Sequence, residues 1–133
     1  MHSDIVVTAS YDRGRTWSKP VVATPGGDVT YFQPKVAVDT AGQVAISAFA
    51  LANGRMDEVL LVASPGELHF RQPLKVTAAP FNPLDSTTAS RGKYGTWWLG
   101  DWQGIAGGAG ACHLVWNDTR TGKLDLFAAT VRP

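Results

Sequence analysis

The chain has 133 residues, with twelve lysines and arginines against eleven aspartates and glutamates, and a formal net charge of +1. This balance excludes the basic surface by which proteins bind nucleic acid or an anionic membrane, so we expect neither as a partner. The hydrophobic share of 44% argues against disorder, and no apolar run approaches the roughly 18 residues that span a bilayer.

The first predicted elements are two short β-rich runs at residues 4–10 and 16–24, which form a hairpin. The turn between them centres on Asp12 and Gly14. A carboxylate in such a turn bonds nearby backbone N–H groups, and glycine accepts a positive φ. Trp17 is predicted to re-enter the core directly after this turn.

Beyond the hairpin, short β-rich runs alternate with clusters of Gly, Pro, Asn and Asp, and no window has a sustained helical period. This pattern predicts an all-β chain. A shift of 68 positions places residues 33–57 on residues 101–125 without a gap, and the turn glycines Gly42 and Gly54 fall on glycines. The chain is therefore expected to contain repeated units of short strands.

Repeats of this length favour the blades of a β-propeller, whose four strands we label A to D from the inside outward. The predicted strands are C and D at 4–10 and 16–24, then A to D at 34–39, 43–50, 57–63 and 69–77, then A to C at 102–107, 111–117 and 124–131. A propeller needs at least four blades, and these strands make about two.

We therefore expect one partial-propeller domain over residues 1–133. It comprises strands C and D of one blade (4–24), a complete blade (34–77), a long loop (78–100) and strands A to C of the next blade (101–131). Either it belongs to a longer chain, or copies of it assemble into a ring. In a ring, strands C and D of one copy would complete strands A and B of the next, and three copies would leave one C strand each.

The turn Ser10-x-Asp12-x-Gly14-x-Thr16-Trp17 resembles the Asp box, the bacterial neuraminidase repeat of sialidase-like β-propellers. In that family the box joins the third and fourth strands of a blade and serves folding, far from the substrate. The resemblance implies a six-bladed propeller and a secreted or cell-surface protein.

A second shift, of about 53 positions, places Trp17 on Phe70 and Thr24 on Thr77. Residues 64–70 then occupy the Asp-box position of the complete blade in degenerate form. The compartment is not indicated by the residues themselves, since no signal peptide opens this sequence.

The two predicted D–A connections differ in length: residues 25–32 make eight, and residues 78–100 make twenty-three. Loops longer than about 12 to 15 residues in a compact domain are usually functional or mobile. Arg91, Tyr94 and Trp98 in the long loop suit sugar recognition, because aromatic rings stack on sugar C–H surfaces and a cation meets a carboxylate. The alternative is that the tryptophans of this loop plug the channel or seal two blades.

A second group of candidates is Asp101, which opens a strand A, with Asp118 and Arg120, which follow the next strand B. A hairpin that turns near residue 109 makes these charges neighbours. The other repeat has uncharged residues at the same places, so the fold itself does not require them. A ligand-binding role and a structural Asp101–Arg120 ion pair both remain open.

The segments 98–106 and 116–120 also resemble the closing blades of secreted sialidase-like proteins of unassigned activity. Authentic exo-sialidases add an Arg-Ile-Pro segment, three arginines that clamp the sugar carboxylate, a Tyr–Glu nucleophile pair and an aspartate acid/base. No Arg-Ile-Pro is present here, and the three arginines and the Tyr–Glu pair find no assignment. We therefore predict no complete catalytic set on this chain.

The predicted function is binding of carbohydrate, with a sialic-acid-type glycan as candidate, through the D–A and B–C loops of one face. The predicted ligand-binding residues are Trp98, Asp101, Asp118, Arg120, Arg91 and Tyr94. The alternatives are a portion or protomer of an exo-glycosidase, and a structural or interaction propeller without ligand. No metal or cofactor is predicted, because the single cysteine and the three histidines have no metal-ligand spacing.

Overall fold

The computed structural model describes residues 2–85, 99–100 and 102–133, and the regular structure in them is entirely β. The described strands form three antiparallel sheets of two, four and three strands. They are β1 (Val6–Val7), β2 (Val21–Val22), β3 (Thr30–Val38), β4 (Val44–Ala52), β5 (Arg55–Ala63), β6 (Leu74–Lys75), β7 (Gly104–Gly108), β8 (Ala111–Asp118) and β9 (Asp125–Val131). The prediction of an all-β chain is confirmed.

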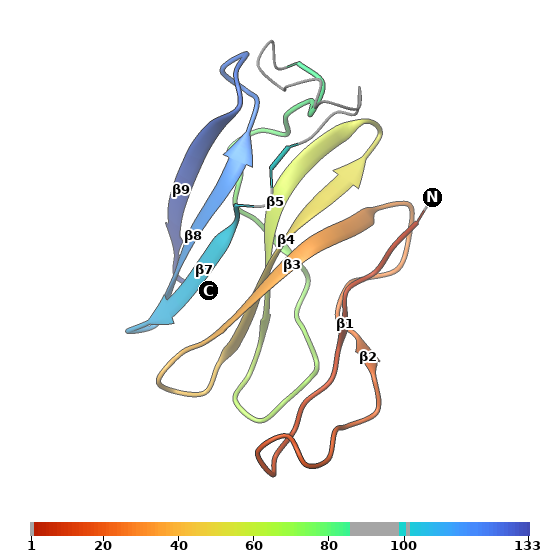
Figure 1. Cartoon of the computed structure of the whole chain (residues 1–133), viewed down its shortest axis with the longest axis vertical. Helices are drawn as coiled ribbons and strands as arrows, with labels where there is room; N and C mark the ends of the chain where they lie inside the picture. The colour runs from red at the N-terminus through yellow and green to blue at the C-terminus, as the bar shows by residue number, and fades with distance from the viewer. Residues whose placement is uncertain (1, 86–98, 101) are drawn as a thin grey trace.

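The three sheets follow one another in space as they do in the chain, with the four-stranded sheet β3–β6 in the middle (Figure 1). Each described strand pairs only with its neighbours in sequence, so each sheet is a meander built from local hairpins. Successive side chains of a strand point to opposite faces. The central strands β4 and β5 are therefore apolar on both faces, because a sheet lies on either side of them.

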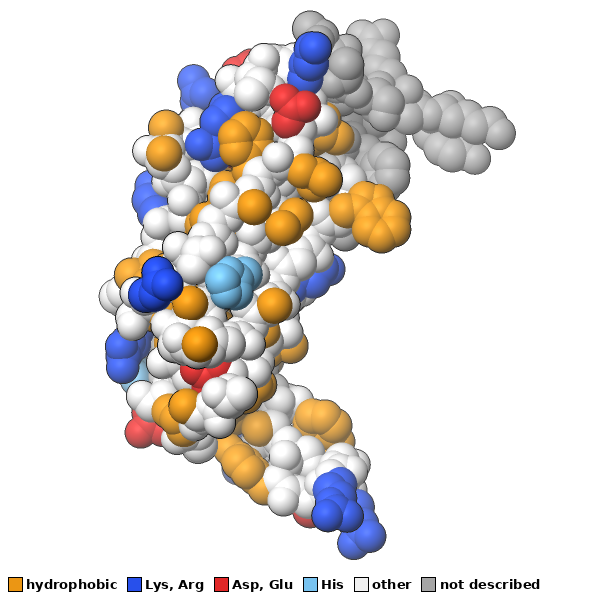
Figure 2. Space-filling model, turned by 90° about the vertical axis from the view of Figure 1, so that its left-hand side faces the viewer, with side chains coloured by type: hydrophobic (Ala, Val, Ile, Leu, Met, Phe, Trp, Pro, Cys, Tyr) orange, Lys and Arg blue, Asp and Glu red, His pale blue; other side chains and the backbone are white. Residues whose placement is uncertain are grey.

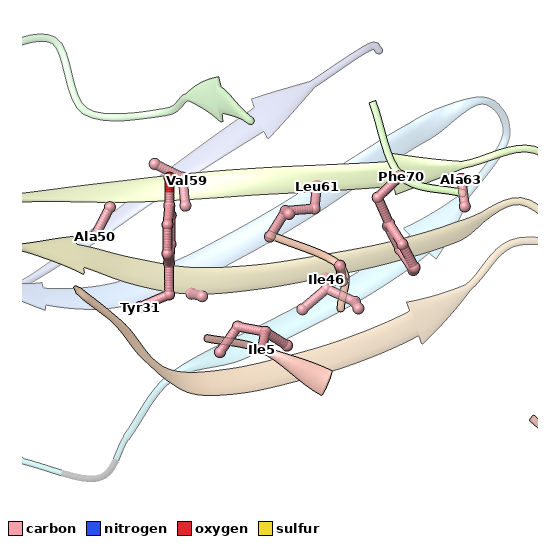
Figure 3. Close-up of a cluster of buried hydrophobic side chains, with 10 residues drawn as sticks. Ile5, Tyr31, Ile46, Ala50, Val59, Leu61, Ala63 and Phe70 are labelled. Carbon is pink, nitrogen blue, oxygen red and sulfur yellow. The ribbon is translucent and has the colours of Figure 1, made fainter. Parts of the chain in front are cut away.

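The interface between the middle sheet and the β1–β2 hairpin holds the first core cluster (Figure 3). Ile46 of β4 and Leu61 of β5 pack there against Ile5, which precedes β1. Phe70 closes one end of the cluster and Tyr31 closes the other. Only two residue pairs of β1 and β2 form a regular ladder, and the hairpin is also held by this packing and by backbone hydrogen bonds such as Tyr31 N–H to the Ser3 carbonyl at 2.9 Å.

The opposite face of the middle sheet packs on β7–β9 and forms the second cluster. Phe49 lies at its centre, fully buried, with its ring centroid 5.6 Å from that of Phe32 and 6.1 Å from that of Phe81. Leu114 and Trp116 of β8 complete the packing from the other sheet. This interface holds the sheet β7–β9 against the middle sheet β3–β6.

The D strands are much shorter than the predicted ranges 16–24 and 69–77, because regular pairing is confined to β2 and β6. Pro20 and Pro73 directly precede these pairs. Proline lacks the N–H that a ladder requires, so the ladder is interrupted at Pro20 and Pro73, and the residues before them make only isolated backbone contacts such as Arg71 N–H to the Val62 carbonyl at 3.0 Å.

The A strand β3 begins at Thr30, four residues before its predicted start, and contains a bulge between Phe32 and Lys35. Pro34 lies in the bulge, and Gln33 before it adopts a φ of 52°. A proline inside a β-rich run indicates a strand end in sequence, whereas here the bulge absorbs the missing N–H.

The predicted Asp-box turn is closed by the side chains that the motif provides. Asp12 Oδ1 accepts hydrogen bonds from the Thr16 backbone N–H (2.8 Å) and the Ser10 hydroxyl (2.9 Å), and Asp12 Oδ2 accepts one from the Thr16 hydroxyl (2.7 Å). The Gly14 N–H, at a φ of 84°, donates to Ser10 Oγ at 2.7 Å. The motif residues therefore satisfy the backbone of the turn without help from the rest of the chain.

Trp17, the last residue of the motif, does not re-enter the core as predicted: it is 63% exposed. Its counterpart at the shift of 53, Phe70, is 9% exposed because it packs in the first cluster, which forms between the middle sheet and the preceding hairpin. No described strands precede the β1–β2 hairpin in the same way. Trp17 is exposed because burial of this position depends on a preceding sheet.

The turn also supplies a test of its own. Bonds from the Thr16 hydroxyl and N–H lower the pKa of Asp12 to about 2, so their stabilisation is present above the ordinary pKa of 3.8 and is lost as pH falls through about 2. We expect Asp12→Ala to lower the melting temperature by several degrees at neutral pH, while the exposed Arg15→Ala leaves it unchanged. Differential scanning calorimetry would detect both, and equal melting of the two variants would contradict a structural box.

Candidate functional site

The candidate site lies at the end of β8, where the start of the long connection meets both neighbouring sheets. Phe81 exchanges two backbone hydrogen bonds with Met56 at the start of β5, of 2.8 and 2.9 Å. The Thr119 hydroxyl, just beyond β8, donates to the carbonyl of Asn82 at 2.7 Å. Phe81 and Asn82 therefore fasten this connection to β5 on one side and to the β8 end on the other.

Asp118 and Arg120 form the charged centre of this corner. The Asp118 carboxylate is fully buried and accepts hydrogen bonds from the Arg120 N–H (2.8 Å), the Arg120 Nε (2.9 Å) and the Trp116 Nε1 (3.3 Å). Arg120 Nη2 also bonds the same carboxylate. The guanidinium carbon lies 4.5 Å from the centre of the Phe127 ring. Arg120 is thus held in one orientation by an anion and an aromatic face.

The Arg120 side chain remains 28% exposed, and its Nη1 has no hydrogen-bond partner among the described residues. A planar guanidinium that is fixed by its own carboxylate can present its other edge to a second anion without losing further side-chain entropy. The corner is therefore suited chemically to recognition of a carboxylate or another oxyanion. Proton transfer is not expected from it, because an arginine keeps its proton and Asp118 is shielded.

The chain returns to this corner at Gly100, which has a φ of 88°. A Cβ at this position would lie 2.6 Å from Nδ2 of Asn117, the residue before Asp118. Only glycine permits so close an approach at this φ. The end of the long connection is therefore packed tightly against the end of β8.

Two of the six predicted ligand-binding residues, Asp118 and Arg120, are described, and the structure brings them into direct contact. Trp98, Asp101, Arg91 and Tyr94 lie outside the described residues. Within the described residues, Arg120 forms its ion pair with Asp118. The sequence predicts Asp118 as a ligand group beside Arg120 and offers Asp101 as the ion-pair partner.

Sequence reasoning missed a buried polar cluster between the middle sheet and the sheet β7–β9. Glu58 of β5 is fully buried, and its Oε2 accepts a hydrogen bond from Gln103 Nε2 at 3.3 Å. Glu58 Oε1, Gln103 Oε1 and the Ser47 hydroxyl oxygen are buried without hydrogen-bond partners among the described residues. Burial raises the pKa of Glu58 to about 8, against a smaller opposing effect of the nearby Ser47 hydroxyl.

One sequence signal could have identified Glu58. The 68-residue shift places it on Leu126, so a charged residue occupies a position that is apolar in the other repeat. The following run Val59–Val62 is uninterrupted and apolar, which is typical of a strand buried on both faces. A carboxylic acid in such a run must be paired or protonated.

The described residues contain no group of three or more His, Cys, Asp or Glu side chains arranged to hold a metal ion. His113 is exposed and shares a 3.0 Å hydrogen bond with Thr130, whereas Cys112 beside it is buried on the opposite face. Within the described ranges, no helix is long and apolar enough to cross a membrane.

Comparison with known proteins gives no relative: no family model, no curated protein and no solved structure matches this chain.

Proposed function

We propose that this chain is a two-blade unit of a sialidase-like Asp-box β-propeller and binds an acidic carbohydrate at the β8 end. The observation that carries the proposal is the fixed Arg120, which is held by Asp118 and Phe127, while its Nη1 has no hydrogen-bond partner among the described residues. A sugar carboxylate would occupy that edge of the guanidinium. The six predicted residues include aromatic side chains from the long loop that would stack on the sugar ring.

The three sheets pack face to face in the same way at each interface, which supports the interpretation as propeller blades. On β4 and β5 one set of alternate residues packs toward the preceding sheet and the other toward the following one. The same alternation holds on β9, where Phe127 and Ala129 face the preceding sheet while Leu126 and Ala128 face outward. Successive sheets thus pack in one repeated manner, as blades do.

The binding test uses Arg120→Lys, because lysine keeps the positive charge beside the buried Asp118 but cannot present a planar edge. We expect this change to weaken binding of sialyllactose by about tenfold, with the melting temperature within a few degrees of the wild type. Titration calorimetry with lactose as the neutral ligand separates carboxylate recognition from general sugar affinity. The control is Arg15→Ala, an exposed arginine at the tip of the Asp-box turn, which should bind normally.

If Arg120→Lys and the wild type bind sialyllactose with equal affinity, Arg120 does not recognise the sugar carboxylate. No binding of any glycan by the wild type would favour the structural propeller. Turnover of a fluorogenic sialoside that is lost in Asp101→Asn would favour the exo-glycosidase alternative.

We also infer that further sheets cover the two outer faces of the described structure. Apolar side chains are exposed on the outward face of β7–β9, where Figure 2 shows hydrophobic side chains distributed over the surface. Val115 of β8 is 42% exposed and Leu126 of β9 is 65% exposed, and Val6 and Val22 on the N-terminal hairpin are more than half exposed. Exposed apolar faces at both ends fit a head-to-tail assembly.

Light scattering tests the assembly. We expect a discrete homo-oligomer, with a trimer as the ring of six blades, or else completion of the ring by further blades of a longer chain. β9 covers the outer edge of β8 along its length, so strand exchange at that edge would require β9 to detach. A stable monomer in solution would contradict the formation of a homo-oligomer by copies of this chain.

A further inference from the structure

The same kind of side-chain hydrogen bond, from a threonine to an aspartate, occurs in each of the two sheets that contain a predicted D strand. The Thr24 hydroxyl donates to Asp4 Oδ1 at 2.7 Å, and the Thr77 hydroxyl donates to Asp57 Oδ1 at 2.6 Å. The register Val6↔Val22 places Asp4 directly opposite Thr24, and the register Val59↔Lys75 places Asp57 opposite Thr77. Both pairs therefore join the start of a C strand to the end of its D strand.

The second oxygen of each aspartate takes a different donor. Asp4 Oδ2 is 3.0 Å from His2 Nε2, and Asp57 Oδ2 is 2.8 Å from Lys75 Nζ. The threonine bond at Oδ1 is thus the feature that recurs, while the partner of Oδ2 varies. Both threonines are buried, at 6% and 7% exposure, although the Asp4 side chain remains 28% exposed.

Asp125 occupies the equivalent place on β9. Asp125 lies opposite Asp118 on β8, and Asp57 lies opposite Ala50 on β4. The 68-residue shift places Asp57 on Asp125 and Ala50 on Asp118. Asp125 Oδ2 accepts a hydrogen bond from the Thr121 hydroxyl at 2.6 Å, which parallels the variable donor of the other two sheets. Asp125 is exposed, and no described strand pairs with the outer edge of β9.

We propose that the outer edge of β9 binds an extended antiparallel strand that places a threonine opposite Asp125, with the hydroxyl donating to Oδ1. The backbone of β9 supplies the ladder, and the side-chain bond sets its register, because a slip by one residue would turn the threonine to the other face. The partner is an extended segment whose backbone is not already paired within another sheet. The threonines of β2 and β6 in a second folded copy are already bonded to Asp4 and Asp57, so those strands do not qualify.

The proposal is independent of glycan binding, and its probe is a fluorescein-labelled peptide with the sequence of residues 69–79, which contains the strand β6 and Thr77. Fluorescence polarisation would measure its affinity for the whole chain. We expect saturable binding, weakened about fivefold or more by Thr77→Val in the peptide and by Asp125→Asn in the protein. When both changes are present, we expect no further loss, because they remove the same bond.

The matched control is Asp28→Asn, an exposed aspartate in the turn before β3, which should not affect binding. Hydrogen exchange should slow in residues 125–131 on peptide binding and remain unchanged in residues 44–52. Absence of binding at about 1 mM peptide, equal affinity of the threonine and valine peptides, or protection elsewhere than β9 would overturn the proposal.

Discussion

The free energy of unfolding of the wild type is expected to fall by about 3 kcal/mol between pH 5 and pH 8, while that of Glu58→Gln stays nearly constant. Burial raises the pKa of Glu58 to about 8 in the folded chain, from an ordinary value of 4.5. Between these values the folded state keeps a proton that the unfolded state has released. The stabilisation is therefore complete below about pH 4.5 and is lost as pH rises through 8.

Among the described residues, those that interact with Glu58 carry no charge that would hold it ionised. Phe49 lies directly opposite on β4, and the polar neighbours, Ser47 and Gln103, are neutral. A protonated carboxyl can accept from Gln103 Nε2 with one oxygen and donate with the other, which an ionised carboxylate cannot do. Glutamine at this position keeps one donor and one acceptor without a titrating proton.

Urea unfolding at several pH values, followed by tryptophan fluorescence, would measure the difference. The control is Glu67→Gln, in the exposed turn 64–67, which should leave the pH dependence of the wild type intact. Other groups with shifted pKa values act outside this interval: those of Asp4 and Asp12 are lowered, and those of Tyr31 and Cys112 are raised from 10.0 and 9.0. A wild type whose stability is flat from pH 5 to pH 8 would show that Glu58 is not protonated.

Arg120→Ala is expected to reduce the free energy of unfolding by about 3 kcal/mol at pH 7. The change leaves the fully buried Asp118 carboxylate with only the Trp116 Nε1 and a backbone N–H as donors. It also removes the cation from the Phe127 ring. An uncompensated buried charge costs more than the net worth of the ion pair itself.

A double-mutant cycle with Asp118→Asn separates these contributions. Once the charge at residue 118 is removed, Arg120→Ala should cost about 1 kcal/mol or less. Equal costs in the two backgrounds would mean that the ion pair does not stabilise the fold. The same reasoning explains why Arg120→Lys, and not Arg120→Ala, is the variant suited to measuring ligand binding.

Local chemistry in the sequence was sufficient to predict several elements. The turn at residues 10–16 could be predicted because Ser10, Asp12 and Thr16 satisfy it with their own side chains. The alternation of β-rich runs with turn residues was sufficient to predict an all-β chain, since such signals act over a few residues. The predicted strand 111–117 likewise placed Asp118 and Arg120 together, just beyond its end.

Contacts between sheets were decided by tertiary structure alone. Trp17 is exposed and Phe70 is buried, although the two occupy equivalent positions, because only Phe70 has a preceding sheet among the described residues. Glu58 is buried because β7–β9, more than forty residues further along, cover its face of β5, and Gln103 reaches it from that distance. Sequence by itself determined the hairpins and their turns, whose interactions are local; which faces are covered, and hence which charges are paired or protonated, depended on packing between segments distant in the chain.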